Sequence, residues 1–520
     1  MRRLIPGIVV VFSVLVVNFA SEAKFERATI SGTVKSPAGD GLTGVLVRLI
    51  NTDRRISVSV LSQAGGRYFA DALFPGTYEV RAELKGYGPA IKKGVQADGP
   101  VSVNLVLREP AAAHLTSADV FDQFPEHPDK NLVFDTCFRC HSMSNVLKVR
   151  KSRRQWETLV KRMAPRRRAG ITEDEINRLI NYFAQYFNEN TPLGTPFADA
   201  PEASRGAMPV RITEYSIPEQ EPPEVTVPSA NSAPIFPHNI TVTPQGIVWF
   251  AMYQSNRIGS LEPRTGEFQS YPVPTPGSVP HGITVGRDGF IWFTEARGKK
   301  VGRLDPKTGK IIEVPTNSGG NTIVEDSKGN MYLTMGGANQ IGKVNAKTLE
   351  HTAYDLITPR AGPYGIVVDQ KDRVWWCQLM ADSIGMLDPE TGKITEYPTP
   401  TKMSAPRRLT VDKSGTIWFT EWLANKLGRL DPTTGEIKEY ELPTLGSEAY
   451  EVRVDAEDTV WVAGYLSNTL ARFDRVKETF TMYPIPTPRS EIRKMAADPE
   501  QGIWFAGSHS DTIGHVMVKR

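Results

Sequence analysis

Five consecutive residues have the types and spacing of a covalent cofactor attachment sequence. They are Cys137-Phe-Arg-Cys140-His141. Two thiols three positions apart can bond to the two vinyl groups of a haem, and the adjacent imidazole reaches the iron from one face. A redox dithiol and a structural disulfide are the alternatives, but neither explains His141. The motif therefore predicts a covalently bound haem c.

The second axial ligand of the iron is expected on the segment that follows. Residues 152–163 have a helical period that includes Trp156 and Met163, and a second helix is predicted after Thr172, which can form a capping box with Glu175. This segment resembles small class I c-type cytochromes, and the resemblance implies that Met163 is the axial thioether. A core methionine on an amphipathic helix is the alternative. A His/Met pair raises the potential of a haem and suits electron transfer with a redox partner protein.

Two histidines and a carboxylate form a second candidate site. His238 and His281 are 43 residues apart, and Glu295 follows His281 by fourteen. Asp288 lies midway between His281 and Glu295, so a strand–turn–strand unit would place these two side chains opposite each other, with β-carbons roughly 5 Å apart. Two neighbouring histidines with a carboxylate suit a divalent cation and a general base.

A sequence repeat must position these residues. Aromatic anchors recur about 43 residues apart through the last three-fifths of the chain, at Trp249, Trp292, Tyr332, Trp375, Trp418, Trp461 and Trp504. A short apolar run and a turn precede each anchor, and two further strands follow most of them. Four short strands per repeat at this period predict a seven-bladed β-propeller.

The closure of the ring is also predicted. The last repeat stops at its third strand, Ile513-Gly-His-Val516, and the segment Val210-Arg-Ile-Thr-Glu-Tyr215 is similar to the fourth strands of the other repeats. We expect this N-terminal segment to complete the last blade and so to remove exposed strand edges.

The residues eleven positions before the anchors differ in polar chemistry from blade to blade. They are His238, His281, Asn321, Tyr364, Arg407, Tyr450 and Arg493. Structural positions in a repeat protein are expected to be alike, so this variation favours a ligand-binding face at the mouth of the ring. The alternative is a set of exposed strand ends without a ligand.

The repeats also resemble those of a known enzyme family. Pro280-His281-Gly-Ile-Thr and Ile291-Trp292-Phe-Thr-Glu295 are similar to motifs of virginiamycin B (streptogramin B) lyases, over a stretch from about Val210 to the C-terminus. These enzymes are seven-bladed propellers that open a cyclic depsipeptide at its ester by elimination, with Mg²⁺. The resemblance implies that His281 is the general base, that Glu295 holds Mg²⁺ and that His238 lies close by.

The N-terminal quarter of the chain has two expected parts. Residues 1–23 have the charged start, apolar run and small residues of a secretory signal peptide, with an uncleaved anchor as the alternative. Residues 27–108 alternate apolar and polar residues between Gly and Pro turns, which predicts a small antiparallel β-sandwich. Through Gly66-Arg-Tyr-Phe and Pro75-Gly-Thr-Tyr-Glu-Val this part resembles the carboxypeptidase regulatory-like domain.

The fold class expected for the 520 residues is multidomain and mainly β. An N-terminal β-sandwich precedes a small all-α cytochrome c domain at residues 113–190, a linker at residues 191–209 and the propeller at residues 210–520. The net charge of +3 gives no nucleic-acid footprint. No span of the membrane is expected after cleavage of the signal, so the sequence predicts a periplasmic or otherwise exported protein. Cys377, next to a tryptophan on a strand, is expected to be buried and inert.

Three functional hypotheses follow. The first is an exported c-type haem protein that transfers electrons, with the propeller as a module that binds a substrate or a partner. The second is a Mg²⁺-dependent carbon–oxygen lyase that opens a small cyclic depsipeptide or another exported substrate, with an accessory cytochrome. The third is a propeller that serves only as a protein-binding scaffold. Whether the protein is a lyase, a haem-dependent oxidoreductase or no enzyme is left open by the sequence.

Overall fold

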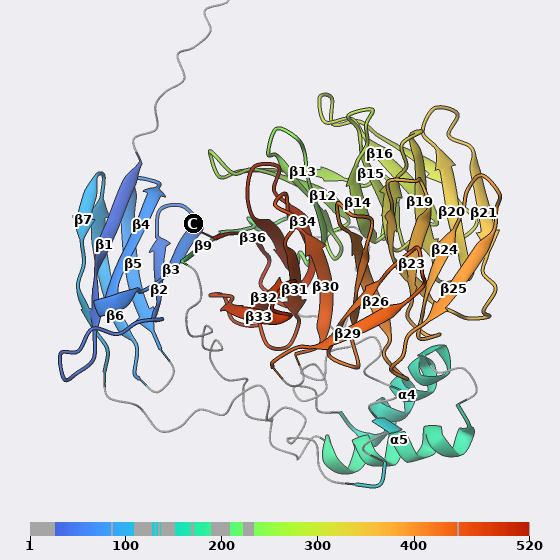
Figure 1. The fold of residues 1–520 in the computed structure, drawn as a ribbon, viewed down its shortest axis with the longest axis horizontal. Coiled ribbons are helices and arrows are strands. Elements are labelled where there is room, and N and C mark those ends of the chain that lie inside the picture. The colour runs from blue at the N-terminus through green and yellow to red at the C-terminus, as the bar shows by residue number, and fades with distance from the viewer. Residues whose placement is uncertain are drawn as a thin grey trace, which may run out of the picture.

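The computed structural model describes most of the chain and is mainly β. The described residues are 27–84, 87–108, 127–129, 132, 133, 136, 151–167, 171–188, 209–221, 233–444 and 447–518. A β-sandwich, a pair of helices and a ring of blades are its three parts, as Figure 1 shows.

The N-terminal part is the expected sandwich of two sheets. The first sheet contains β4 (Arg67–Leu73), β1 (Ala28–Lys35) and β7 (Pro100–Ser102), with β8 (Leu105–Val106) beside β1, and a short 3-10 turn at Ala64–Gly66 precedes β4. The prediction that the sandwich is antiparallel is wrong for this sheet in part, because β1 pairs with β7 and β8 in parallel. The second contains β3 (Ile56–Leu61), β2 (Leu46–Asn51), β5 (Gly76–Glu83) and β6 (Ala90–Ala97). Side chains alternate between the two faces of each strand. In β5, Tyr78, Val80 and Ala82 are buried in the core between the sheets, and the residues between them are half-buried.

The propeller consists of seven four-stranded antiparallel blades, as predicted. Blades 1 to 3 are β10–β13 (Pro237–Val242, Val248–Met252, Arg257–Glu262, Glu267–Pro272), β14–β17 (Pro280–Val285, Ile291–Glu295, Lys300–Leu304, Ile311–Pro315) and β18–β21 (Ile323–Glu325, Asn330–Met335, Gln340–Asn345, His351–Asp355). Blades 4 to 6 are β22–β25 (Pro363–Val368, Val374–Gln378, Ser383–Leu387, Ile394–Pro398), β26–β29 (Pro406–Val411, Ile417–Glu421, Lys426–Leu430, Ile437–Glu441) and β30–β33 (Ala449–Val454, Val460–Gly464, Thr469–Asp474, Thr479–Pro484). Blade 7 is β34 (Ile492–Ala497), β35 (Ile503–Gly507), β36 (Thr512–Val518) and β9 (Val210–Ser216).

The tryptophan anchors are fixed by a hydrogen bond as well as by burial. In blades 4 to 7 the indole N–H donates to the aspartate six residues earlier, over 2.6 to 2.9 Å. That aspartate begins the turn between the two inner strands, where its other oxygen accepts backbone N–H groups in blades 4 to 6. One carboxylate therefore sets both the turn and the ring that packs between blades.

Strand β9 closes the ring, which confirms the prediction for this segment. It pairs with β36 along its whole length, from Val210 opposite Val518 to Ser216 opposite Thr512. The seventh blade is thus built from both ends of the propeller segment.

The other edge of β9 carries the sandwich. Strand β3 pairs with β9 from Ile56 opposite Tyr215 to Val60 opposite Arg211, so blade 7 and one sheet of the sandwich form a single eight-stranded sheet. Figure 1 shows β9 between the blue sandwich and β36. Leu46 and Leu61 of the sandwich are also buried in the core of blade 7. The pairing satisfies backbone groups that an outermost strand would otherwise expose.

The described part of the central segment includes two helices. They are α4 (Arg153–Arg167) and α5 (Glu173–Tyr186), and Thr172 and Glu175 form the predicted capping box at the start of α5. Trp156 stacks on Phe183 with ring centroids 4.7 Å apart, which joins the helices. No helix among the described residues is long and apolar enough to span a membrane.

The predicted haem attachment residues lie outside the described part of the chain. This holds for Cys137, Cys140 and His141, whereas Met163 lies within α4 but its side chain is outside the description. The structure therefore shows a small helical unit in this region. That this unit is a cytochrome and binds haem remains a prediction.

Candidate functional site

A β-bulge at the start of the inner strand determines which side chains reach the axis of the ring. In blade 2, Pro280 pairs with Glu295 and Ile283 pairs with Phe293, so the inner strand has one residue more than its partner between these pairs. The same shift occurs in blades 1, 4, 5, 6 and 7. A bulge redirects the side chains of the strand that carries it.

Because of this bulge, the prediction that His281 and Glu295 face each other is wrong. His281 and Glu295 are not opposite each other across the hairpin, because Glu295 pairs with Pro280 and His281 lies in the bulge. The equivalent pair Arg407 and Glu421 is displaced in the same way, with Pro406 opposite Glu421. The prediction counted residues from the middle of the turn and so assumed a strand pair without a bulge. The extra residue in the inner strand shifts His281 out of register with Glu295.

The predicted mouth positions do come together across the ring. The rings of His238 and His281 have centroids 3.9 Å apart, and the rings of His281 and Tyr364 have centroids 5.8 Å apart. The hydroxyls of Tyr364 and Tyr450 are 3.0 Å apart. Residues from blades 1, 2, 4 and 6 therefore form one polar cluster, which we call the mouth cluster together with Arg407 and Arg493.

The tautomer of His281 follows from its partner. Nδ1 of His281 lies 2.6 Å from the carbonyl oxygen of Asn321, which can only accept a hydrogen bond. Nδ1 therefore carries the proton, and Nε2 keeps a free lone pair. Burial, followed by the positive charges of Arg408, Arg493 and Arg407, lowers the pKa of His281 to about 3. The ring is neutral over the physiological range.

His238 is held in the same neutral state. Burial, then His281 and two arginines, lowers the pKa of His238 well below its ordinary value. Its Nδ1 lies 3.0 Å from Oδ1 of Asn239. The two imidazoles are thus adjacent, tilted rings without charge, and each is hydrogen-bonded to an asparagine.

Two arginines converge on the hydroxyl of Tyr450. Nη2 of Arg407 donates to this oxygen over 2.9 Å, and Nη1 of Arg493 donates over 3.3 Å. Burial opposes ionisation of Tyr450, but Arg407, Arg493 and Arg408 outweigh it and lower its pKa to about 7. In Tyr364 burial raises the pKa to about 12. The pair therefore contains one phenol that is more acidic than usual, Tyr450, and one that is less acidic, Tyr364.

A second layer of residues closes the axis next to the mouth cluster. Arg408 extends from blade 5 and donates to Thr322 of blade 3 over 2.6 Å and to Asn239 of blade 1 over 3.1 Å. Its Nε lies 3.4 Å from Glu451 of blade 6, which also pairs with Lys494 over 2.8 Å. This layer was not predicted from the sequence, although each member directly follows a mouth position.

Glu295 lies in a different environment from His281. Its side chain is fully buried, and neither carboxylate oxygen has a hydrogen-bond partner of good geometry among the described residues. Burial and the neighbouring Glu313 raise the pKa of Glu295 to about 8, while Lys300 and Ser278 oppose the rise. Lys300 itself donates to Glu313 over 2.7 Å.

The same arrangement recurs in blade 5. Glu421 is fully buried without a hydrogen-bond partner in the described chain, and burial and Glu439 raise its pKa to about 8. Lys426 donates to Glu439 over 2.9 Å. Blade 5 has Arg407 at its mouth position in place of a histidine, so Glu421 is a natural control for any role of Glu295.

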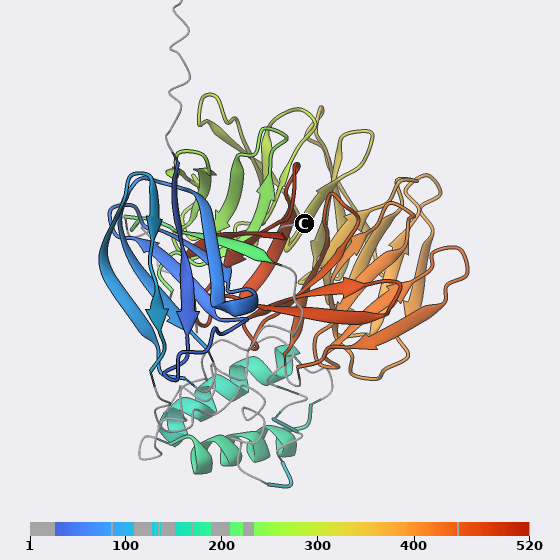
Figure 2. The same cartoon turned by 60° about the vertical axis from the view of Figure 1, so that its left-hand side comes forward.

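The helical unit lies beside the mouth cluster. Leu423 and Leu466 pack both against the core of α4 and α5 and against the buried aromatic group of Trp422, Tyr450 and Tyr465. Both views show the two helices, drawn in teal, below the ring of blades (Figures 1 and 2). The helices therefore adjoin the same end of blades 5 and 6 that carries Tyr450. On blade 4, Cys377 is buried, as expected.

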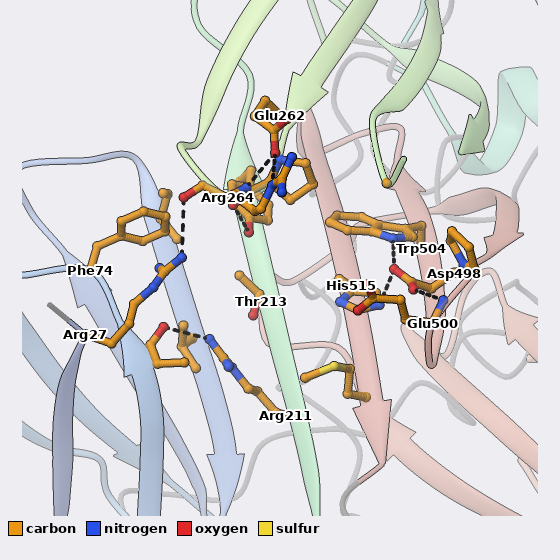
Figure 3. Close-up of a pocket in the computed structure, with 18 of the residues that line it drawn as sticks. Arg27, Phe74, Arg211, Thr213, Glu262, Arg264, Asp498, Glu500, Trp504 and His515 are labelled. Carbon is orange, nitrogen blue, oxygen red and sulfur yellow. Dashed lines mark hydrogen bonds and ion pairs between the residues drawn. The ribbon is translucent and has the colours of Figure 1, made fainter. Parts of the chain in front are cut away.

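A separate cavity of about 430 Å³ lies where the sandwich meets blades 1 and 7. Figure 3 shows Arg27 beside Phe74 on the sandwich side and the pair of Trp504 and His515 on the blade side. Asp498 accepts from the indole of Trp504 over 2.6 Å and lies 3.3 Å from His515. The lining residues belong to the junction of the two domains, away from the mouth cluster.

Two parts of the chain match known families. Residues 210–473 match the model of the virginiamycin B lyase family, and residues 29–108 match the carboxypeptidase regulatory-like domain. No curated protein sequence matches the chain.

Solved lyase structures are similar to the propeller. The selenomethionine-substituted virginiamycin B lyase of Staphylococcus aureus is 27% identical, with a TM-score of 0.54, and the match covers 60% of this chain and 100% of that chain. A streptogramin B lyase structure is 29% identical with the same TM-score, over 60% of this chain and 98% of that chain. A catalytically inactive variant of the Staphylococcus aureus enzyme with quinupristin is 26% identical with a TM-score of 0.54, over 60% of this chain and 100% of that chain.

Proposed function

Since the family match spans half of the chain, the protein belongs to the virginiamycin B lyase family, and we propose that its propeller is a carbon–oxygen lyase that acts by elimination. The observation that carries the proposal is the tautomer of His281. With Nδ1 bound to the carbonyl of Asn321, the lone pair of Nε2 is free to accept a proton. The ring of the second histidine, His238, lies beside that of His281, with centroids 3.9 Å apart.

The reaction on a cyclic depsipeptide can be written with these groups. Nε2 of His281 takes the proton from the carbon beside a carbonyl group. The released electron pair forms a carbon–carbon double bond, and the bond from the next carbon to the ester oxygen breaks. The ester leaves as a carboxylate, so the ring opens without the addition of water.

Glu295 fits a role as the protein ligand of Mg²⁺. Its two oxygens are buried and have no hydrogen-bond partner of good geometry among the described residues, and a cation would offset the desolvation that raises its pKa. Mg²⁺ commonly takes only one or two protein carboxylates and fills its other positions with water and substrate. When bound, the ion would polarise the substrate carbonyl.

The test uses the full chain, a streptogramin B and Mg²⁺, followed by chromatography with mass spectrometry. Elimination gives a linear product of unchanged mass, whereas hydrolysis adds one water. Loss of the product in His281→Ala and in Glu295→Gln, but not in Glu421→Gln, is the expected result. A product that persists in His281→Ala removes this residue from the mechanism.

We also propose that the helical segment binds haem c and transfers electrons in an exported, periplasmic protein that meets a redox partner. Cys137 and Cys140 would hold the haem covalently, with His141 and Met163 as the axial ligands. The observation that favours a joint role is the packing of the helices beside the mouth cluster.

Expression with a c-type maturation system tests the haem proposal. The purified chain should carry haem through denaturation, and a Cys137→Ala, Cys140→Ala double variant should not. Met163→Ala should lower the reduction potential while the covalent attachment persists. A chain that incorporates no haem under these conditions contradicts the proposal.

A further inference from the structure

The cavity of about 430 Å³ between the sandwich and blades 1 and 7, which we call the junction cavity, has the shared sheet as its floor. Arg211, Thr213 and Tyr215 alternate along β9, so their side chains lie on one face of the strand. Val58 of β3 and His515 of β36 lie opposite Thr213 on its two sides. All five residues line the cavity, which therefore exists only where β9 joins the two domains.

Two arginines line the sandwich side of the junction cavity. Arg27 lies against Phe74, with its guanidinium 4.5 Å from the ring centroid, and its Nη2 donates to the carbonyl of Arg264 over 3.4 Å. Arg211 extends from β9 toward the sandwich, where its Nη2 donates to the carbonyl of Ala72 over 3.3 Å. Figure 3 shows the two side chains on the same side of the cavity.

The guanidinium of Arg211 is a largely buried cation with few partners. Its Nε is buried and has no hydrogen-bond partner among the described residues. Its Nη1 lies 4.0 Å from Oδ1 of Asp71, which is too far for a hydrogen bond. Burial is the main cause that lowers the pKa of Arg211. Because a charge removed from water is costly without such partners, an anion in the junction cavity would stabilise Arg211.

The turns of blades 1 and 7 place carboxylates on the opposite side of the junction cavity. The lining acids are Glu262, Asp498 and Glu500, and Arg264 accompanies them at 3.2 Å from Glu262. Three acids thus stand with one arginine on the blade side, whereas the described residues that line the sandwich side include two arginines and no acid. The two sides of the cavity therefore favour opposite charges.

His515 adds a hydrogen-bond acceptor to the blade side. Its Nε2 lies 3.1 Å from the carbonyl oxygen of Gln501, which can only accept, so Nε2 carries the proton. Burial lowers the pKa of His515 to about 4, and the ring is therefore neutral at pH 7. The ring stacks on Trp504 with centroids 4.3 Å apart, which fixes its plane. Nδ1 keeps a lone pair to which no described residue donates a hydrogen bond.

We propose that the junction cavity binds a zwitterion, a free amino acid or a short peptide, by its two charged ends. The carboxylate binds Arg27 and Arg211, because the paired N–H groups of a guanidinium match the geometry of a carboxylate. The ammonium lies on the blade side and donates to Nδ1 of His515, while Glu262 and Glu500 favour its charge. The site is separate from the mouth cluster and depends on neither the lyase nor the haem proposal.

The separation of charge in the lining distinguishes a zwitterion from a simple anion. An inorganic phosphate would meet the two arginines, but it would also face the acids of the blade side and leave Nδ1 of His515 without a donor. A zwitterion satisfies both sides. The apolar side chains of Val58, Phe74 and Met517 also line the cavity and can pack against the carbon atoms of such a ligand.

Calorimetry on the full chain tests the binding. L-alanine, dialanine and trialanine carry the same two charges at increasing separation, so the tightest of them identifies an amino acid or a peptide as the ligand. Its amide lacks the carboxylate, and its N-acetyl form lacks the ammonium. The zwitterion should bind at least about tenfold more tightly than either form, because each lost contact is a hydrogen bond to a charged group.

Variants assign the two ends of the ligand. The preference over the amide should disappear in Arg211→Gln and decrease in Arg27→Gln, a change at an exposed side chain that leaves the strands intact. The preference over the N-acetyl form should disappear in His515→Phe, which keeps an aromatic ring on Trp504. Arg303→Gln is the matched control and should keep both preferences. Arg303 lies opposite the anchor of blade 2, as His515 does in blade 7.

Three outcomes overturn the inference. The first is that none of the three zwitterions binds, and the second is that the zwitterion, its amide and its N-acetyl form bind equally. The third is that inorganic phosphate and the N-acetyl form bind as tightly as the zwitterion, which would make the cavity a site for simple anions. Both preferences in wild type, with their loss in the matching variants, establish the site whether or not the chain cleaves a streptogramin or carries haem.

Discussion

Arg408 on blade 5 donates a hydrogen bond to Asn239 on blade 1, at 3.1 Å, across the axis of the propeller. The same guanidinium binds Thr322 on blade 3 and lies 3.4 Å from Glu451 on blade 6. One fully buried side chain therefore connects four blades. Because this link closes the axis, a ligand can approach only from the side of the mouth cluster. The link also fixes the positions of the strands that carry the residues of the mouth cluster.

Replacement of Arg408 by Met should destabilise the propeller strongly. The change removes a hydrogen-bond donor from Asn239 on blade 1 and from Thr322 on blade 3, and Glu451 loses Arg408 but retains its ion pair with Lys494. Removal of one partner from a buried pair costs about 3–5 kcal/mol, and we expect the lower end because Lys494 remains. Urea unfolding followed by tryptophan fluorescence measures the loss. Arg303→Met is the control and should cost less than about 1 kcal/mol, so equal losses in the two variants would contradict the role of Arg408.

The sequence predicted the blades well because their determinants are local. Each anchor and the turn before it are close in sequence, and so is the capping box of Thr172 and Glu175. The closing strand β9 could also be predicted, since it carries the pattern of a fourth strand. Because similar residues recur at the same position of each repeat, the structure of a blade can be inferred from every repeat in turn.

The site was predicted less well because its geometry depends on one extra residue and on contacts across the ring. The bulge has no signal of its own in the repeat, so His281 was wrongly paired with Glu295. The layer of Arg408 and Glu451 depends on neighbours from distant blades. The junction of β3 with β9 was not predicted at all, because both strands read as ordinary members of their own domains.

The buried carboxyls of Glu295 and Glu421 should make stability fall as the pH rises. Their pKa values are about 8 in the folded chain, above the ordinary value of 4.5. Between these values the folded state binds more protons than the unfolded state, so their contribution is full below about pH 4.5 and is lost toward pH 8. Relative to wild type, the Glu295→Gln, Glu421→Gln double variant should gain free energy of unfolding over this range. Urea unfolding at a series of pH values measures the difference, and a constant difference would contradict the raised pKa values.

The effect of Mg²⁺ on stability should distinguish the carboxylate of Glu295 from that of Glu421. If the ion binds at Glu295, it stabilises the folded chain at pH 8, where it competes with a proton for the same oxygens. We expect Mg²⁺ to raise the Tm of wild type and of Glu421→Gln but not that of Glu295→Gln. Thermal unfolding with Mg²⁺ and with a matched ionic strength of NaCl gives the comparison. The same rise in all three chains would place the ion elsewhere.

One tyrosine should ionise near neutral pH. The positive charges of Arg407 and Arg493 beside its hydroxyl lower the pKa of Tyr450 to about 7. Ultraviolet difference spectra between pH 5 and pH 9 should therefore show one phenolate that is absent from Tyr450→Phe. In Arg493→Gln the transition should move to higher pH, because a neutral amide no longer favours the anion. Tyr253→Phe is the control, and a transition that persists in Tyr450→Phe would assign the phenolate to another residue.

The sandwich should protect the propeller from self-association. Strand β3 covers the outer edge of β9, and Leu46 and Leu61 cover part of the core of blade 7. A chain that begins at residue 209 would expose this edge and these apolar contacts, and uncovered edges pair with other chains. We expect the truncated chain to dimerise or aggregate at concentrations where the full chain is stable in its native state.

Light scattering coupled to gel filtration measures this difference. Two variants of the truncated chain make the test specific to the edge. Thr213→Lys and Arg211→Pro each disrupt pairing along β9, whose residues Thr213 and Arg211 lie opposite Val58 and Val60 of β3. Both should reduce association of the truncated chain. A truncated chain that stays monomeric would show that the outer edge of blade 7 does not need the sandwich, and that the shared sheet instead sets the position of the sandwich relative to the ring.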